Sequence, residues 1–237
     1  GYINGLDSYK DEDFSKRNFN TDAYRDANSQ RLSVRFKKES KDSLISITPY
    51  VRNNDMKFFQ HFLPGTPLEE NNHRSMGIVI QQISDKESYS FVRGLQIDLA
   101  KAELTETQRD ALTTSSAFNN ATRPKGKHYD YEVDSFVYAF FGGIEDFYLN
   151  ESLNFFADAR AEFIEYEYSN KMISGNTRED GTKCGFGGCY YNRPSDRTDD
   201  FNEVSARMGL VTNYENINYF FQVSLGFRPP QINEAYS

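Results

Sequence analysis

The sequence predicts an all-β protein: one antiparallel sheet of about eight strands arranged in four hairpins. Three observations support this prediction. Apolar and polar residues alternate with a period of two along most of the chain, and no helical stripes of Lys, Glu and Ala appear. Several alternating stretches are longer than the roughly 5–6 residues usual for strands of soluble sheets. The connections between these stretches alternate strictly between short and long.

The clearest strand is Asn218–Arg228. One of its faces carries only apolar residues from Tyr219 to Phe227, and the other face is mostly polar. The remaining strands repeat this alternation, and a short turn joins the two members of each hairpin. In chain order, the predicted pairs are Leu32–Phe36 with Ile45–Val51, Met76–Ile83 with Tyr89–Leu99, Tyr131–Phe141 with Leu153–Phe163, and Val204–Leu210 with Asn218–Arg228.

Two residues interrupt the apolar faces, Pro49 and Arg93. Proline cannot donate a backbone hydrogen bond and is disfavoured in central strands. The strand Ile45–Val51 is therefore the one that the sequence supports least.

The three long connections all lie at the same end of the predicted hairpins. They are Asn53–Arg74, Lys101–Tyr129 and Ser169–Asn202. Outer-membrane barrels have this asymmetry, with short periplasmic turns and long extracellular loops. The pattern favours a segment of an antiparallel transmembrane β-barrel, with the apolar faces toward lipid and the polar faces toward the lumen.

The alternation alone does not fix which face points outward. Charged residues on the polar face, such as Asp158, Arg160 and Arg207, suit a water-filled lumen. They would also suit the solvated exterior of a soluble sandwich or small barrel, whose apolar faces point inward. Both arrangements stay open at this stage.

Composition excludes two classes of protein. The longest apolar runs, such as Phe136–Phe141, are far shorter than the roughly 18 residues of a membrane helix. The formal net charge is −8, from 27 basic and 35 acidic residues, which argues against nucleic acid as a partner. The mean hydropathy of −0.74 does not exclude a membrane barrel, because barrel strands are apolar on one face only.

Three segments resemble TonB-dependent outer-membrane receptors. Leu225–Tyr236 is similar to a recurring stretch in which a strand ends in Gly-Phe-Arg/Lys-x-Pro and a Glu-Leu-Tyr-like run follows. Asp22–Gln30 is similar to another such region. Phe59–Gly65 is similar to a loop of the siderophore-receptor branch.

This resemblance implies that residues 1–237 are part of a single barrel domain, an internal slice of a plugged barrel of about 22 strands. The plug, the TonB-contacting box, the remaining strands and the terminal aromatic residue are expected to lie outside this sequence. The implied function is TonB-dependent uptake of a scarce ligand, first of all a ferric siderophore, in the bacterial outer membrane. The implied partners are this ligand, outer-membrane lipid and, through the plug, the TonB complex. No enzymatic reaction is implied.

Arginine and aromatic side chains on the polar face suggest a ligand site. Such groups bind planar anionic ligands by charge-assisted hydrogen bonds and stacking, and ferric siderophores are of that kind. Alternatively, the arginines form charge networks with Asp158 and Glu162 that fill the lumen. The residues expected near the outer rim, and hence the candidate ligand contacts, are Tyr50, Arg52, Tyr166 and Arg228.

The three histidines are His61, His73 and His128, each in or beside a predicted long loop. His61 and His73, twelve residues apart, could help to bind a metal chelate, and His61 joins the candidate ligand contacts. Alternatively, they are solvated loop residues. No HExxH, CxxC or clustered ligand set is present, so neither a resident metal site nor a cofactor is expected.

Cys184 and Cys189 flank Gly185–Gly188 in the third long connection. The glycines let the backbone turn, and two cysteines in an exported β protein favour a disulfide. A metal site lacks enough local ligands, and a catalytic thiol is the remaining alternative.

Two other functions compete with the receptor slice. One is a self-contained eight-stranded outer-membrane barrel for adhesion or structure. The other is a secreted soluble β binding module, conceivably an enzyme. With 35 acidic residues, chance places many carboxylates near one another, so carboxylate pairs do not by themselves indicate a glycosidase.

Overall fold

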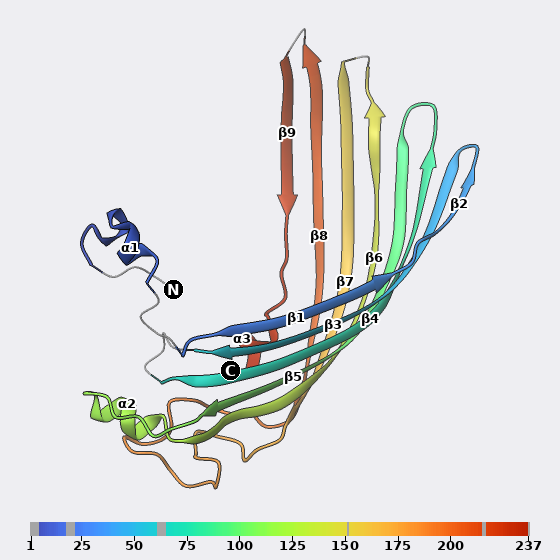
Figure 1. Cartoon of the computed structure of the whole chain (residues 1–237). Helices are drawn as coiled ribbons and strands as arrows, with labels where there is room; N and C mark the ends of the chain where they lie inside the picture. The colour runs from blue at the N-terminus through green and yellow to red at the C-terminus, as the bar shows by residue number, and fades with distance from the viewer. Residues whose placement is uncertain (1–4, 18–21, 61–64, 151, 215–216, 237) are drawn as a thin grey trace.

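The computed structural model describes residues 5–17, 22–60, 65–150, 152–214 and 217–236. Nine strands form one antiparallel sheet in the order β1-β3-β4-β5-β6-β7-β8-β9, with β2 also paired to β3 (Figure 1). The strands are β1 Arg25–Ser33, β2 Phe36–Ser40, β3 Ser43–Phe59, β4 Pro67–Asp85, β5 Ser90–Gln108, β6 Gly126–Tyr148, β7 Leu153–Asn170, β8 Arg197–Tyr214 and β9 Ile217–Leu225. The helical elements are short: η1 Ser8–Lys10, α1 Glu12–Ser15, α2 Ala117–Thr122 and α3 Ile232–Tyr236.

The four predicted hairpins are all present, as β2/β3, β4/β5, β6/β7 and β8/β9. A ninth strand arises because β1 and β2 lie along the same edge of β3. β1 pairs with Tyr50–Phe58 and β2 with Ser43–Ile47, so they are two parts of one interrupted strand.

Pro49 explains the interruption. The backbone N–H of Val34 donates to the carbonyl of Pro49 at 3.2 Å, but Pro49 has no N–H with which to complete the pair. The strand around Pro49, the one that the sequence supports least, is nevertheless present. β3 runs unbroken for 17 residues, and the proline weakens its neighbour at the sheet edge instead.

The strands are longer than their apolar faces, so the expected bounds of the long connections were wrong. β3 continues through Asn53 to Phe59, and the ladder between β3 and β4 extends to the pair Phe59–Leu68. The connections shrink to residues 60–66, 109–125 and 171–196. Backbone pairing does not require apolar side chains, and the apolar period fades where both faces of a strand meet water.

The sheet is strongly curved and open (Figure 1). β1 and β9 form its two edges, and in the described ranges they do not pair with each other. None of the helices described is both long enough and apolar enough to cross a membrane.

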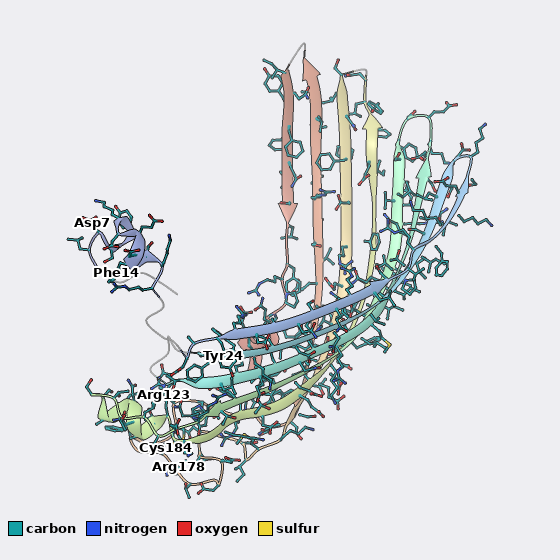
Figure 2. The ribbon with its side chains drawn as sticks, in the orientation of Figure 1. Asp7, Phe14, Tyr24, Arg123, Arg178 and Cys184 are labelled. Atoms are coloured by element: carbon teal, nitrogen blue, oxygen red, sulfur yellow. A yellow bond between two sulfur atoms is a disulfide. The ribbon has the colours of Figure 1, made fainter. Side chains whose placement is uncertain are left out.

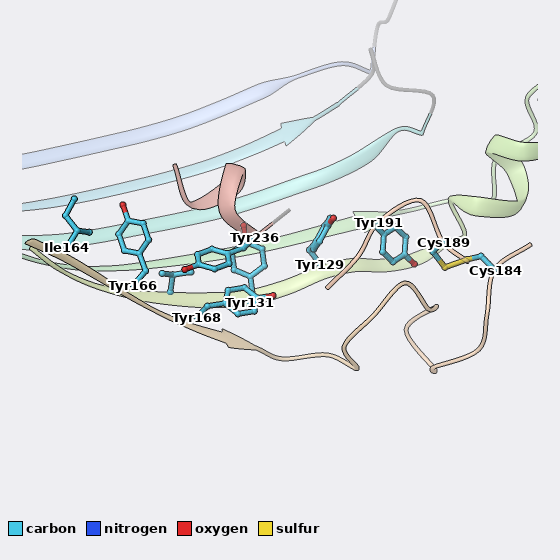
Figure 3. Packing of buried hydrophobic residues seen from close by; sticks show 10 residues of the cluster. Tyr129, Tyr131, Ile164, Tyr166, Tyr168, Cys184, Cys189, Tyr191 and Tyr236 are labelled. Carbon is cyan, nitrogen blue, oxygen red and sulfur yellow. A yellow bond between two sulfur atoms is a disulfide. The ribbon is translucent and has the colours of Figure 1, made fainter. Parts of the chain in front are cut away.

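The main buried cluster lies where β6 and β7 meet α3 and the 171–196 connection (Figure 3). It is built mostly of tyrosine. The sheet is a single layer, so burial occurs where a loop or helix covers it. The cluster comprises Tyr129, Tyr131, Val133, Ile164, Tyr166, Tyr168, Cys184, Cys189, Tyr191 and Tyr236.

Candidate functional site

The strand register gives the sheet one apolar face. Val51, Met76, Leu99 and Phe136 are direct neighbours across four strands and form one row of this face. Large apolar side chains remain exposed along it from β3 to β9. They include Ile45, Ile47, Ile80, Tyr138, Phe140, Val204, Met208, Leu210, Tyr219, Phe221, Val223 and Leu225.

The opposite face is polar and lines the concave side of the sheet. α3 lies inside the curve (Figure 1), and its Tyr236 packs against Tyr131 and Tyr168, which share the polar face. An apolar convex face and a polar concave face are the arrangement of a membrane barrel wall.

Tyr50, Arg52 and Asp98 form a connected cluster on this concave face. The Tyr50 hydroxyl donates to the Asp98 carboxylate, and Arg52 Nη2 donates to the same oxygen at 3.0 Å. The guanidinium carbon of Arg52 lies 4.9 Å from the centre of the Tyr50 ring. The side chain of Arg52 is about one third exposed and that of Asp98 13%, so the guanidinium is the more accessible partner of this ion pair on the concave face.

Two unpartnered polar atoms adjoin this cluster. Ser75 is directly paired with Arg52 across β3 and β4 and is 7% exposed. Neither Ser75 Oγ nor Arg52 Nε has a hydrogen-bond partner within the described part of the chain. Both atoms are buried, so each is an unsatisfied polar group beside the cluster.

A row of paired residues links Arg52 to Tyr166: Arg52, Ser75, Ala100, Ser135 and Tyr166 are successive neighbours from β3 to β7. The two candidate residues therefore share a level on the wall but lie four strands apart. Tyr166 is itself buried against the ring of Phe201, at 5.5 Å between centres.

The other candidates do not join this cluster. Arg228 follows the end of β9, and its Nη2 donates to Glu234 Oε1 at 3.0 Å. This ion pair lowers the pKa of the Glu234 carboxyl. His61 lies outside the described residues. His73 is within β4, paired with Asn54, and not in a loop as expected.

A second cluster of charged and polar side chains lies on the same face, further from the long connections than the Tyr50 cluster. Arg160 donates to Glu162 at 3.0 Å and to Gln96 at 3.2 Å, and Arg207 pairs with Asp158. A hollow of about 460 Å³ opens beside these residues. The wall thus contains charge networks of the kind expected as the alternative to ligand binding.

Three glycines let aromatic rings lie flat on the concave face. Gly77 is paired with Tyr50, Gly94 with Phe141, and Gly209 with Phe156. In each case a Cβ on the glycine would overlap atoms of the partner's side chain. Gly77 thereby allows the Tyr50 ring to reach Asp98. The period-two pattern of the sequence could not identify these pairs, because it does not say which residues of two strands lie opposite each other.

The 171–196 connection is held by a disulfide and a buried arginine. Cys184 and Cys189 are joined, with their Cα atoms 4.8 Å apart. Figure 2 shows Cys184 and Arg178 close to α2, away from the tips of the short turns. Burial raises the pKa of the Tyr191 hydroxyl in this connection.

Arg193 is 1% exposed and was missed by the sequence analysis. Its guanidinium donates to the carbonyls of Ile173, His128, Thr177 and Arg178. A buried charge requires such compensation. An arginine in a loop gives no sequence signal of burial, so this role emerges only from the structure.

Comparison with protein-family models and with curated proteins gives no match. Solved structures share the fold. The copper transporter OprC has a TM-score of 0.61 at 12% identity, covering 88% of this chain and 32% of its own. The open form of the ferric-catecholate import receptor Fiu from E. coli K12 has a TM-score of 0.57 at 11% identity, covering 88% and 37%.

The unliganded ferric citrate transporter FecA has a TM-score of 0.55 at 10% identity, covering 85% of this chain and 27% of its own. This chain therefore spans between 27% and 37% of the length of these three structures. Each of them is a transporter or an import receptor. The likeness confirms the predicted fold class, an antiparallel transmembrane β-barrel segment, and the sheet of this chain is open.

Proposed function

We propose that this chain forms part of the barrel wall of a bacterial outer-membrane receptor. This receptor would import a scarce ligand with energy delivered through TonB. The observation that carries the proposal is the cluster of Tyr50, Arg52 and Asp98 on the polar concave face, on a sheet whose other face is apolar. Ligand capture and passage, without a catalysed reaction, are the proposed activity. The plug and the remaining strands are proposed to belong to the same receptor.

The two faces support the proposed location. Every backbone group in a bilayer must be satisfied by pairing, which closed sheets achieve. The exposed row of Val51, Met76, Leu99 and Phe136 suits lipid contact, whereas charged side chains such as Arg160 on the other face suit a lumen. The 60–66, 109–125 and 171–196 connections are then extracellular.

A planar anionic metal chelate is the proposed ligand class, with a ferric siderophore first among its members. Arg52 offers a charged donor beside an aromatic ring, and Ser75 adds an unpartnered hydroxyl. This combination suits an anionic oxygen attached to a flat ring system. The solved structures with this fold include two ferric-chelate receptors and a copper transporter.

The test replaces Arg52 with alanine in the intact receptor. Arg93 provides a matched control, because it lies on the apolar face and donates to Gln82. A hydrogen bond to a charged group contributes about 1.5–3 kcal/mol. Arg52→Ala is therefore expected to weaken binding of radiolabelled ferric siderophore by roughly 10- to 100-fold, whereas Arg93→Ala leaves it unchanged. Equal binding by both variants would refute a role for Arg52.

A further inference from the structure

A shallow apolar groove crosses the convex face of the sheet where β5 to β9 lie side by side (Figure 1). It is closer to the short turns than to the long connections. Its floor consists of small residues on neighbouring strands, namely Gly142, Ala157, Ala159 and Ala206. Phe91 and Met208 stand on its two flanks, and the hollow has a volume of about 490 Å³. The convex face therefore has a depression that its own side chains do not fill.

The groove begins beside Arg93. Arg93, Gly142, Ala159 and Ala206 are successive neighbours from β5 to β8, and Leu225 on β9 ends the row. With strands about 4.8 Å apart, this row is roughly 19 Å long. A Cβ at Gly142 would lie only 3.7 Å from the Cβ of Arg93, so the missing side chain of the glycine leaves the floor open up to the arginine.

Arg93 is an exposed cation between Phe91 and Leu95 on the apolar face. Its Nε and Nη2 both donate to the neutral Oε1 of Gln82, at 3.0 and 2.7 Å, and no carboxylate in the described ranges pairs with it. A positive charge on the lipid face of a barrel is tolerated best near the membrane interface. Arg93 lies near the start of β5, where that interface is expected. The groove thus has an apolar trough with an unneutralised positive charge at one end.

We propose that this groove binds one anionic phospholipid, with an acyl chain along Gly142, Ala159 and Ala206 and the phosphate at Arg93. The inference rests on the proposed function, since it requires the convex face to contact lipid. The short turns are then periplasmic, so the lipid belongs to the periplasmic leaflet.

The chemistry of both ends of the groove supports this occupant. The guanidinium N–H groups that Gln82 leaves unused can donate charge-assisted hydrogen bonds to phosphate oxygens. An acyl chain in the groove contacts the floor and the flanking side chains, which gives more dispersion contacts than a flat wall does. Because barrel strands tilt by roughly 35–45°, a row across the strands is inclined to the membrane plane, as a lipid chain is.

The first experiment titrates the purified intact receptor in detergent with phosphatidylglycerol and, separately, with a diacylglycerol that has the same chains but no phosphate. Native mass spectrometry measures the bound lipid. The wild type is expected to bind one phosphatidylglycerol roughly 10- to 100-fold more tightly than the diacylglycerol, as for a hydrogen bond to a charged group. Arg93→Ala should remove this preference. Arg93→Lys keeps the charge but not the fork of donors, so it should keep part of the preference.

Lys38→Ala is the matched control for the charge. Lys38 is in the same row, but Ile45 and Gln82 separate it from Arg93. This variant should bind both lipids as the wild type does. Excess glycerol 3-phosphate, which has no acyl chains, should not displace phosphatidylglycerol, because the groove contributes to its binding.

A second pair of variants tests the groove. Ala159→Leu places a larger side chain on the floor and should weaken phosphatidylglycerol and diacylglycerol alike. Ala161→Leu, on the same face of β7 but outside the groove, should match the wild type. Unchanged affinity for phosphatidylglycerol in Arg93→Ala or in Ala159→Leu, or displacement by glycerol 3-phosphate, would overturn the proposal.

The lipid site and the proposed ligand site lie on opposite faces, so their failures can be told apart. Binding of ferric siderophore, measured on the same samples, reports on the concave face. Loss of the lipid preference with intact siderophore binding would be the expected behaviour of Arg93→Ala. A receptor that binds phosphatidylglycerol as predicted but no siderophore would contradict the proposed ligand class and leave the lipid site standing.

Discussion

At the scale of single residues, the concave face depends on glycines that lie beneath aromatic rings. Gly77, Gly94 and Gly209 each lie directly opposite an aromatic residue whose ring covers them. Glycine normally weakens a strand, because it has no side chain to pack. Here the ring of the neighbouring strand takes that place, as in aromatic rescue of sheet glycines.

Gly94 gives a direct test of this pairing. A methyl group there would overlap the ring of Phe141 and the carbonyl of Ile80. Gly94→Ala is expected to destabilise the barrel by about 1–3 kcal/mol, measured by urea denaturation in detergent. Gly226→Ala is the matched control, since a Cβ at Gly226 meets nothing within 4 Å. An unchanged midpoint for Gly94→Ala would refute the packing argument.

The sequence could predict part of the candidate site at this scale. Alternation places Tyr50 and Arg52 on one face, because they are two residues apart in a strand. Their shared acceptor, Asp98, is 48 residues from Tyr50, and only the register across β3, β4 and β5 brings it into contact. Local periodicity contains no such information.

At the scale of elements, the 171–196 connection is a folded unit and not a free loop. The disulfide closes one end, and Arg193 ties four backbone carbonyls together. One of these carbonyls belongs to His128 in β6, so the connection is fastened to the sheet. Such an element can hold this end of the sheet in one shape.

Arg193 is expected to be more important for this unit than its neighbours. Lysine in its place would lose the fork of donors and leave buried carbonyls unpaired, at about 1–3 kcal/mol each. Arg193→Lys should therefore make the connection sensitive to limited proteolysis while the barrel stays folded. Arg178→Lys, at an exposed position nearby, should behave as the wild type. Equal resistance of the two variants would show that Arg193 does not hold the unit.

Strand position was predictable from the sequence, but strand length was not. All four hairpins appear where the apolar alternation places them. Beyond the apolar band the strands continue through polar stretches such as Glu69–Arg74 in β4, where neither face carries a periodic apolar signal. Likewise, Pro49 interrupts the neighbouring strand and not its own. Pro49 has no N–H to donate across to that strand, so the hydrogen bond is lost between the two strands.

At the scale of the whole molecule, the sheet has two different faces and two open edges. The apolar convex face has no covering layer in the described part of the chain, and β1 and β9 each present an unpaired edge. Exposed edges and apolar faces are hazards for a sheet in water. A bilayer around the convex face and further strands along both edges would resolve both, which is the arrangement we propose.

The most direct test of the membrane-barrel account is the behaviour of the native protein on a gel. An antibody to this segment would be used on outer-membrane fractions, run with and without boiling. We predict a band in the outer membrane that shifts on boiling and has a mass far above the 27.4 kDa of this chain. A band found only in soluble fractions, with no shift on boiling, would contradict the account.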